Sequence, residues 1–75
     1  MDANFLKIVS KALKTSPDHL DEFSTPNTVK GWDSLNHWVL ISELEEAYDI
    51  EFTMEEATEF KNLEDLYCIL KRKTS

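Results

Sequence analysis

The sequence is poor in the residues that build disulfide frameworks, phosphate-binding loops and metal sites. Its 75 residues include one cysteine, one glycine, two prolines and two histidines. The single cysteine, Cys68, cannot pair within the chain, and its place in a helical segment predicts a half-buried thiol, with a reactive thiol as the alternative. The cysteine and histidine spacing matches no metal site, and one glycine is too few for a glycine-rich phosphate loop. We therefore expect neither kind of site.

Long apolar runs are missing as well. No segment approaches the roughly 18 consecutive apolar residues of a membrane-spanning helix, and the N-terminus lacks the continuous apolar core of a signal peptide. A chain of 75 residues has room for one small domain, which buries about 60–65% of its unfolded surface and leaves little space for a deep catalytic cleft. We therefore expect a single domain over residues 1–75, in the cytoplasm and without a membrane span.

Basic residues are scarce in the middle of the chain. The net charge is −7, and residues 33–66 hold eleven acids against one base, Lys61. An anionic segment of this kind disfavours nucleic acid and anionic membranes as partners, and it favours basic protein surfaces, which the field attracts. The alternative is a solvated acidic face that serves only solubility. Because the segment contains the exposed serine discussed below, we favour docking.

What the sequence does contain is helical periodicity in four segments. Helices are predicted over residues 2–14, 34–48 and 54–60, and from residue 62 onward. Thr53 and Glu56 fit a capping box for the short third helix. The side chains expected to face the core are Phe5, Leu6, Ile8, Val9, Ala12, Leu13, Trp38, Leu40, Ile41, Leu44, Ala47, Tyr48, Ile50, Phe52, Met54, Ala57, Phe60, Leu63, Leu66, Ile69 and Leu70.

The first two helices are joined by a long connection, residues 15–30, that is rich in Ser, Thr, Asp and Asn. Connections of this length are uncommon in small domains unless side chains anchor them. We expect Trp32 to close one end of the helical bundle and a single short turn to lie within the connection. The expected anchors are Leu20, Phe23 and Val29.

The second helix begins at an unusual group of residues. Gly31 permits a sharp turn, and Asp33 and Ser34 are residue types that cap helix N-termini. On the opposite side from the core, the helical wheel places Leu35 and Val39 beside Ser34, together with Ser42, Glu43 and Glu46. A hydroxyl is thus expected at the mouth of a helix whose outer face carries two apolar contacts and a row of acids. Such a face is unusual for a purely structural helix.

One further residue near Ser34 carries possible chemistry. His37 follows it by one helical turn, which suggests a serine–histidine pair for nucleophilic catalysis. That chemistry also needs an orienting acid and an oxyanion hole, and the sequence locates neither. We therefore expect His37 to contact a bound group or a partner rather than to catalyse a reaction, and we expect no enzymatic activity.

The sequence Asp33-Ser34-Leu35 stands at the start of an acidic amphipathic helix, and the chain continues with Leu-Glu-Glu-Ala-Tyr-Asp-Ile-Glu-Phe at residues 44–52. Together these segments resemble the acyl carrier proteins. The resemblance covers nearly all of the chain. It implies an all-α fold, a small four-helix bundle of three long helices and a short third one, with a long loop between the first two. It also implies that Ser34 carries a 4′-phosphopantetheine arm, which a phosphopantetheinyl transferase attaches from coenzyme A.

The resemblance assigns further roles by position. The residues expected at the prosthetic group are Ser34, Asp33, Leu35 and His37, and those expected to meet partners are Leu35, Val39, Ser42, Glu45 and Glu46. The implied function is a monomeric carrier that holds an acyl or aminoacyl group as a thioester. Its partners would be a loading ligase and acyl-processing enzymes with basic docking patches, in fatty-acid, polyketide, lipid or related secondary biosynthesis.

The chain departs from fatty-acid carriers around the motif. Trp32 replaces a small residue, residues 36–38 (Asn-His-Trp) are bulkier and less acidic, and Val39 stands where glutamate is common. Phe60 and Trp38 fall near the place where the family shelters long acyl chains, so we expect small or polar cargo. Two alternatives remain. One is an acidic helical adaptor that binds through Leu35 and Val39 without a prosthetic group, and the other is a small hydrolase.

Overall fold

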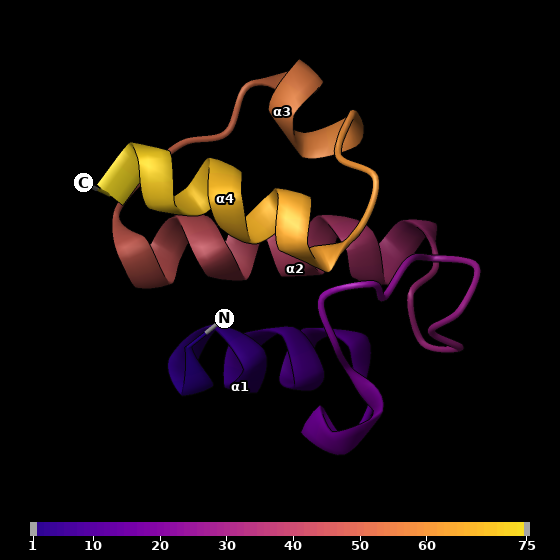
Figure 1. The fold of residues 1–75 in the computed structure, drawn as a ribbon. Coiled ribbons are helices and arrows are strands. Elements are labelled where there is room, and N and C mark those ends of the chain that lie inside the picture. The colour runs from indigo at the N-terminus through magenta and orange to yellow at the C-terminus, as the bar shows by residue number, and fades with distance from the viewer. Residues whose placement is uncertain (1, 75) are drawn as a thin grey trace.

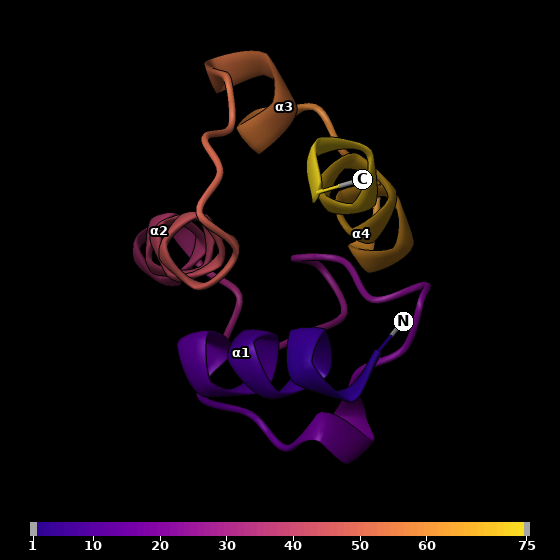
Figure 2. The same cartoon turned by 90° about the vertical axis from the view of Figure 1, so that its left-hand side faces the viewer.

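Two antiparallel helices, α1 (Ala3–Leu13) and α2 (Ser34–Tyr48), form one side of the molecule (Figure 1). Helix α4 (Leu63–Thr74) packs across from them, and the short helix α3 (Met54–Thr58) stands beside α2 and α4 (Figure 2). A 3₁₀ turn, Pro17–His19, interrupts the long connection between α1 and α2. The computed structural model describes residues 2–74, and within them the expected all-helical architecture is confirmed.

The ends of the helices follow from local side-chain chemistry. Asp2 caps α1 by accepting the Phe5 N–H at 2.7 Å, and Thr53 and Glu56 form the predicted capping box at the start of α3. Helices α1 and α2 both end at a residue in the left-handed conformation, Lys14 (φ 56°) and Asp49 (φ 54°). A left-handed residue turns the chain out of the helix and lets its N–H satisfy a terminal carbonyl. None of the helices described in residues 2–74 has both the length and the apolar character that a bilayer crossing requires.

The core lies where α1, α2 and α4 meet. The ring of Phe5 packs edge-on against Tyr67, with 4.9 Å between ring centroids. A hydrogen bond at 3.3 Å from the Asn4 amide to the Tyr48 hydroxyl joins the first turn of α1 to the end of α2. The buried apolar side chains are Phe5, Val9, Ala12, Leu13, Leu20, Val29, Trp32, Leu40, Ile41, Leu44, Ala57, Leu63, Leu66 and Leu70.

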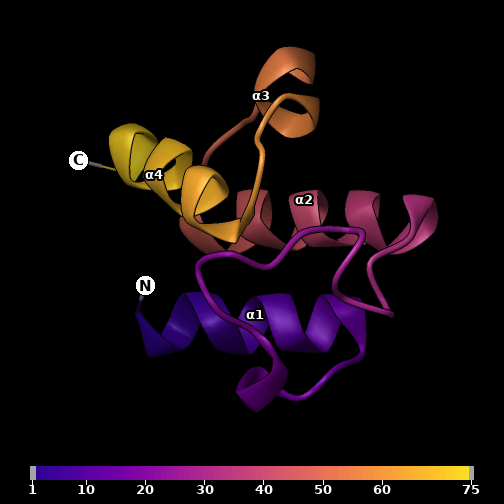
Figure 3. The same ribbon diagram turned by 45° about the vertical axis from the view of Figure 1, so that its right-hand side comes forward.

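The long connection is fixed to the helices at several points. Figure 3 shows it passing from the end of α1 toward the start of α4 before it reaches α2. There the backbone N–H of Leu63 donates to the Ser24 carbonyl at 2.9 Å. A Cβ added at Gly31 would lie 1.9 Å from the carbonyl oxygen of Leu13, so the close approach of the connection to α1 requires glycine at this position.

Two of the three expected anchors of this connection are confirmed. Leu20 and Val29 are buried, and so is Trp32. The prediction for Phe23 is wrong, because its side chain is 71% exposed. Its backbone N–H is held by the Asp21 carboxylate at 2.9 Å in a tight turn that turns Ser24, not Phe23, inward.

Three other predicted core positions lie at the surface. Trp38 is 44% exposed and Ala47 is exposed, because α2 buries only the narrow stripe of Leu40, Ile41 and Leu44. Met54 is 70% exposed. Helix α3 ends at Thr58, two residues earlier than predicted, and Ala57 is its only buried residue. Cys68, predicted to be half-buried, lies on the exposed side of α4.

Candidate functional site

Ser34 is the first residue of the 15-residue helix α2, and it is exposed. The N-cap is Asp33, whose carboxylate accepts the N–H of Asn36 at 2.8 Å. Because Asp33 performs the capping, the Ser34 hydroxyl is not needed for it, and within residues 2–74 this hydroxyl has no hydrogen-bond partner. The site therefore presents an uncommitted hydroxyl to solvent at a fixed position.

The backbone around Ser34 is suited to a negatively charged group. The first hydrogen bond inside α2 is donated by the His37 N–H to the Asp33 carbonyl at 2.8 Å, so the N–H groups of Ser34 and Leu35 precede it. Free N–H groups and the positive end of the helix dipole favour an anion such as a phosphate. The Asn36 side chain donates to the Gly31 carbonyl at 2.9 Å and so fixes the path of the chain into the helix.

A surface pocket of about 450 Å³ opens beside Ser34. Its walls come from the long connection and from the first turn of α2. The lining residues are Pro26, Asn27, Trp32, Asp33, Ser34 and His37. The pocket combines amide, carboxylate and imidazole groups with the edge of a buried aromatic ring. Asn27 and His37 contribute polar side chains to this lining beside Ser34.

His37 uses both nitrogens of its ring. Nδ1 accepts the indole N–H of Trp32 at 3.1 Å, and Nε2 lies 2.7 Å from the carbonyl oxygen of Ala57 in α3. Since an indole nitrogen only donates and a carbonyl only accepts, the ring is held as the neutral tautomer with its proton on Nε2. Neither nitrogen is available to accept a proton from Ser34, which disfavours a catalytic Ser34–His37 pair.

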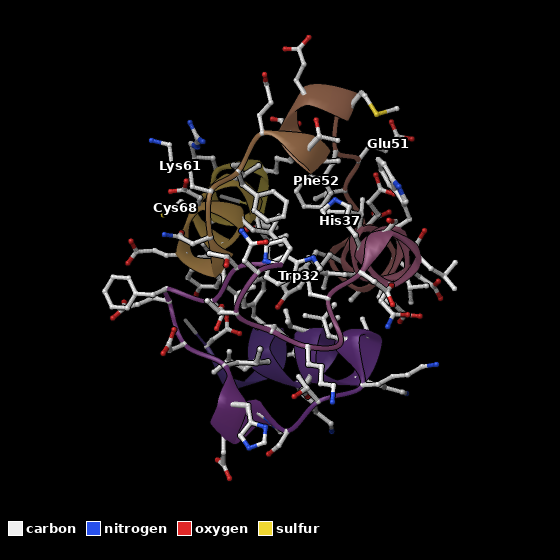
Figure 4. The ribbon with its side chains drawn as sticks, turned by 90° about the vertical axis from the view of Figure 1, so that its right-hand side faces the viewer. Trp32, His37, Glu51, Phe52, Lys61 and Cys68 are labelled. Atoms are coloured by element: carbon white, nitrogen blue, oxygen red, sulfur yellow. The ribbon has the colours of Figure 1, made fainter. Side chains whose placement is uncertain are left out.

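Three nearly parallel rings, Trp32, His37 and Phe60, form what we term the aromatic stack. The Phe60 centroid lies 5.8 Å from that of Trp32 and 5.6 Å from that of His37, with interplanar angles of 27° and 19°. Figure 4 shows Trp32 and His37 meeting in the middle of the molecule, between the ribbons of α2 and the other helices. Periodicity within one helix did not predict this cluster, because its members come from the connection, α2 and the segment after α3.

The outer face of α2 carries most of the predicted partner-binding residues. Leu35 is 74% exposed and Val39 39% exposed, and Ser42 and Glu46 are exposed as well. Trp38, which the sequence assigned to the core, adds a third exposed apolar side chain to this helix. Together these residues form an exposed, partly apolar surface next to Ser34.

Glu45 differs from its neighbours on this helix. It is half-buried, and its carboxylate accepts the backbone N–H of Phe52 at 2.8 Å. The residue therefore holds the segment between α2 and α3 in place, and part of its hydrogen-bonding capacity is committed within the molecule. A contact between residues seven apart across a chain reversal has no local sequence signal, so the sequence indicated only the partner-binding role.

Charge near the outer face of α2 is mixed. A groove of about 540 Å³ runs between α1 and α2, with Lys7 and Lys11 on the α1 side and Val39 and Glu43 on the α2 side. The outer face of α2 is thus acidic at its Glu43 and Glu46 positions but is bordered by two lysines. Periodicity within either helix does not predict this border, since it depends on how α1 and α2 align.

An ion pair connects α3 to α4. The ammonium of Lys73 lies 2.7 Å from the Glu56 carboxylate, which also accepts the backbone N–H of Thr53 at 2.9 Å. The hydrogen bond from Lys73, followed by that from Thr53, holds the pKa of the Glu56 carboxyl below its ordinary value of 4.5. In the part of the chain that the structure describes, no group of three or more His, Cys, Asp or Glu side chains is arranged to hold a metal ion.

Neither a scan against models of known protein families nor a search of curated proteins found a match for this chain. What supports a function is therefore the set of residues and their geometry. The structure brings Asp33, Ser34 and His37 together at one pocket. It places Leu35, Val39, Ser42 and Glu46 on exposed positions of the same helix.

Proposed function

We propose that this protein is an acyl or aminoacyl carrier, with a 4′-phosphopantetheine arm attached to Ser34. The observation that carries the proposal is the exposed Ser34 hydroxyl, free of hydrogen bonds within residues 2–74, at the N-terminus of a 15-residue helix. The resemblance of the Asp33-Ser34-Leu35 segment to the acyl carrier proteins supports it, and so does the order of three longer helices and a short third one.

Attachment requires one group transfer. The Ser34 oxygen forms an ester bond to the coenzyme A phosphorus that bears the pantetheine unit, and the pyrophosphate bond breaks. Adenosine 3′,5′-bisphosphate leaves, and a base of the phosphopantetheinyl transferase takes the hydroxyl proton. The helix N-terminus then stabilises the resulting phosphodiester. When attached, the arm supplies a terminal thiol on which cargo is held as a thioester.

The residues around Ser34 have separate tasks in this proposal. Asp33 caps the helix and fixes the position of the serine, as its 2.8 Å hydrogen bond to Asn36 indicates. Asn27 and His37 line the pocket that receives the first part of the arm. Leu35 provides an apolar contact to the transferase directly beside the reacting oxygen.

Partner enzymes would dock on the outer face of α2. Leu35 and Val39 supply apolar area, Ser42 a hydroxyl, and Glu46 together with the remaining exposed part of Glu45 negative charge. Exposed ion pairs contribute only about 0–1 kcal/mol each, so binding is shared among many contacts and stays transient. A carrier that visits a transferase, a loading ligase and acyl-processing enzymes in turn requires such weak contacts.

The setting of the carrier follows from the same chemistry. Coenzyme A and the enzymes that use acyl thioesters place it in the cytoplasm, as a monomer, in fatty-acid, polyketide, lipid or related secondary biosynthesis. A second candidate is a helical adaptor without a prosthetic group, favoured by the 74% exposure of Leu35 and the 44% exposure of Trp38. Intact-mass analysis after incubation with coenzyme A and a transferase separates the two, because only the carrier gains a phosphopantetheine.

A further inference from the structure

We propose that the aromatic stack of Trp32, His37 and Phe60 closes the core beneath Ser34, so that cargo attached there stays at the surface. This protein would then carry short or polar acyl groups in preference to long alkyl chains. The inference rests on the proposed carrier function for its biological meaning. The closure itself is a property of these three side chains and can be tested without the prosthetic group.

The stack stands between Ser34 and the apolar interior. Trp32 and His37 form part of the wall of the pocket that opens beside Ser34. Trp32 is 3% exposed and belongs to the core cluster, and Phe60 packs against that cluster. A chain attached to Ser34 that entered the core from this pocket would have to displace these rings.

The rings fill the space that an alkyl chain would need. Phe60 lies parallel to both Trp32 and His37, with centroids 5.8 Å and 5.6 Å away. The His37 ring also meets Trp38 edge-on at 5.3 Å, which extends the contacts to the surface of α2. Stacked rings at these distances make direct van der Waals contact, so a chain can enter only if the rings move.

Moving the rings would also break hydrogen bonds. The Trp32 N–H bonds to Nδ1 of His37, and Nε2 of His37 bonds to the Ala57 carbonyl. An alkyl chain offers neither a donor nor an acceptor in exchange. It would leave the indole N–H and the carbonyl unpaired in an apolar environment, which opposes the gain from burying methylene groups.

Further contacts hold α3 over the stack. From the middle of α3, Glu56 pairs with Lys73 of α4 at 2.7 Å. In the segment that leads to α3, Glu45 binds the Phe52 N–H at 2.8 Å. These contacts oppose a displacement of α3 that would open a path past His37. A long alkyl chain therefore stays in water, where each added methylene is unfavourable, whereas a short or polar group has no such penalty.

The test uses a chemical tether in place of the arm. Ser34→Cys is made in a Cys68→Ser background, since Cys68 is exposed and would react as well. The new thiol is alkylated with ethyl, hexyl or dodecyl iodoacetamide. We then record the Trp32 indole N–H resonance, assigned with Trp38→Phe, and the thermal midpoint Tm. The expected result is an unchanged indole resonance and a Tm that does not rise from ethyl to dodecyl.

Two results would overturn the proposal. One is found in the protein whose stack is unaltered: a shift of the Trp32 indole resonance and a rise in Tm that both grow with the length of the attached chain. The other concerns Phe60→Ala, or the milder Phe60→Val if the alanine variant does not fold. These variants open space in the stack, so the dodecyl chain is expected to raise their Tm by about 4 °C or more relative to ethyl. No such rise would show that Phe60 is not what keeps the chain out.

The carrier function is judged by a different readout. If the tether experiment gives the expected result but Ser34 is never modified by coenzyme A and a transferase, closure of the core stands and the statement about cargo falls with the proposed function. If Ser34 is modified and the dodecyl chain enters the unaltered protein, the carrier function stands and the inference about cargo is wrong.

Discussion

Nε2 of His37 lies 2.7 Å from the carbonyl oxygen of Ala57, and this contact joins the first turns of α2 to α3. Helix α3 has five residues, too few to be stable in isolation, so its place in the molecule depends on contacts of this kind. The same imidazole accepts the Trp32 N–H at 3.1 Å. Through these two hydrogen bonds, His37 links the connection that precedes α2 to α3, which follows α2. One side chain thus joins three separate parts of the chain next to Ser34.

Replacing His37 should destabilise the protein. His37→Ala removes two hydrogen bonds and one ring of the aromatic stack, and it leaves the Trp32 N–H and the Ala57 carbonyl without partners. We expect a loss of about 2–4 kcal/mol in the free energy of unfolding, measured by urea denaturation. The control is His19→Ala, since His19 is exposed and its loss should change stability by no more than about 0.5 kcal/mol. Equal effects of the two variants would contradict the assigned role.

Gly31 should tolerate no side chain. In Gly31→Ala the new methyl group would lie 1.9 Å from the Leu13 carbonyl oxygen, so the connection must move away from α1. We expect a destabilisation of about 1–3 kcal/mol by urea denaturation. The neighbouring exposed residue Lys30 provides the control, because Lys30→Ala leaves this contact intact. An alanine at residue 31 that leaves stability unchanged would show that the approach to Leu13 is looser than the structure has it.

The ion pair between Glu56 and Lys73 should make part of the stability depend on pH. Its hydrogen bonds hold the pKa of Glu56 in the folded protein below the ordinary value of 4.5, which applies in the unfolded chain. The stabilisation is therefore fully present above the unfolded pKa and is lost as pH falls through the lower folded pKa. We expect Glu56→Gln to be less stable than the parent at neutral pH and equally stable in strong acid. High salt should reduce the difference at neutral pH, because the pair is partly exposed.

The outer face of α2 should control the rate of modification. Leu35→Ala removes an apolar contact beside Ser34, and we expect kcat/KM for a phosphopantetheinyl transferase to fall about tenfold, equivalent to about 1.4 kcal/mol. Phe23→Ala is the matched control, because Phe23 is 71% exposed, close to the 74% of Leu35, but lies outside α2. If both variants reduced the rate equally, a general loss of apolar surface, rather than docking at α2, would explain the effect.

The sequence predicted those parts of the fold that depend on local chemistry. The bounds of α2, from Ser34 to Tyr48, follow from the capping by Asp33 and from helical periodicity, and the structure confirms them. Leu20 and Val29 were identified as anchors because apolar side chains in a polar connection need a buried place. The exposure of Ser34 agrees with its expected position at the mouth of the helix, away from the core stripe.

What depends on neighbours distant in sequence could not be predicted. Trp38 reads as a core residue on a helical wheel, yet its exposure is set by how closely other helices approach that side of α2. The hydrogen bond from Phe52 to Glu45 and the two that involve His37 connect positions whose proximity follows only from the fold. The candidate serine was thus visible in the sequence, whereas the aromatic stack that lies beneath it was not.

Intact-mass spectrometry of the purified protein after incubation with coenzyme A and a broad-specificity phosphopantetheinyl transferase shows whether Ser34 accepts a phosphopantetheine arm. The carrier function predicts a gain of one phosphopantetheine unit, located on Ser34 by fragmentation. Ser34→Ala should stay folded and gain nothing, and Ser16→Ala, which alters an exposed serine outside α2, should gain the unit as the parent does. A parent protein that stays unmodified under conditions in which a known carrier is fully converted would contradict the account.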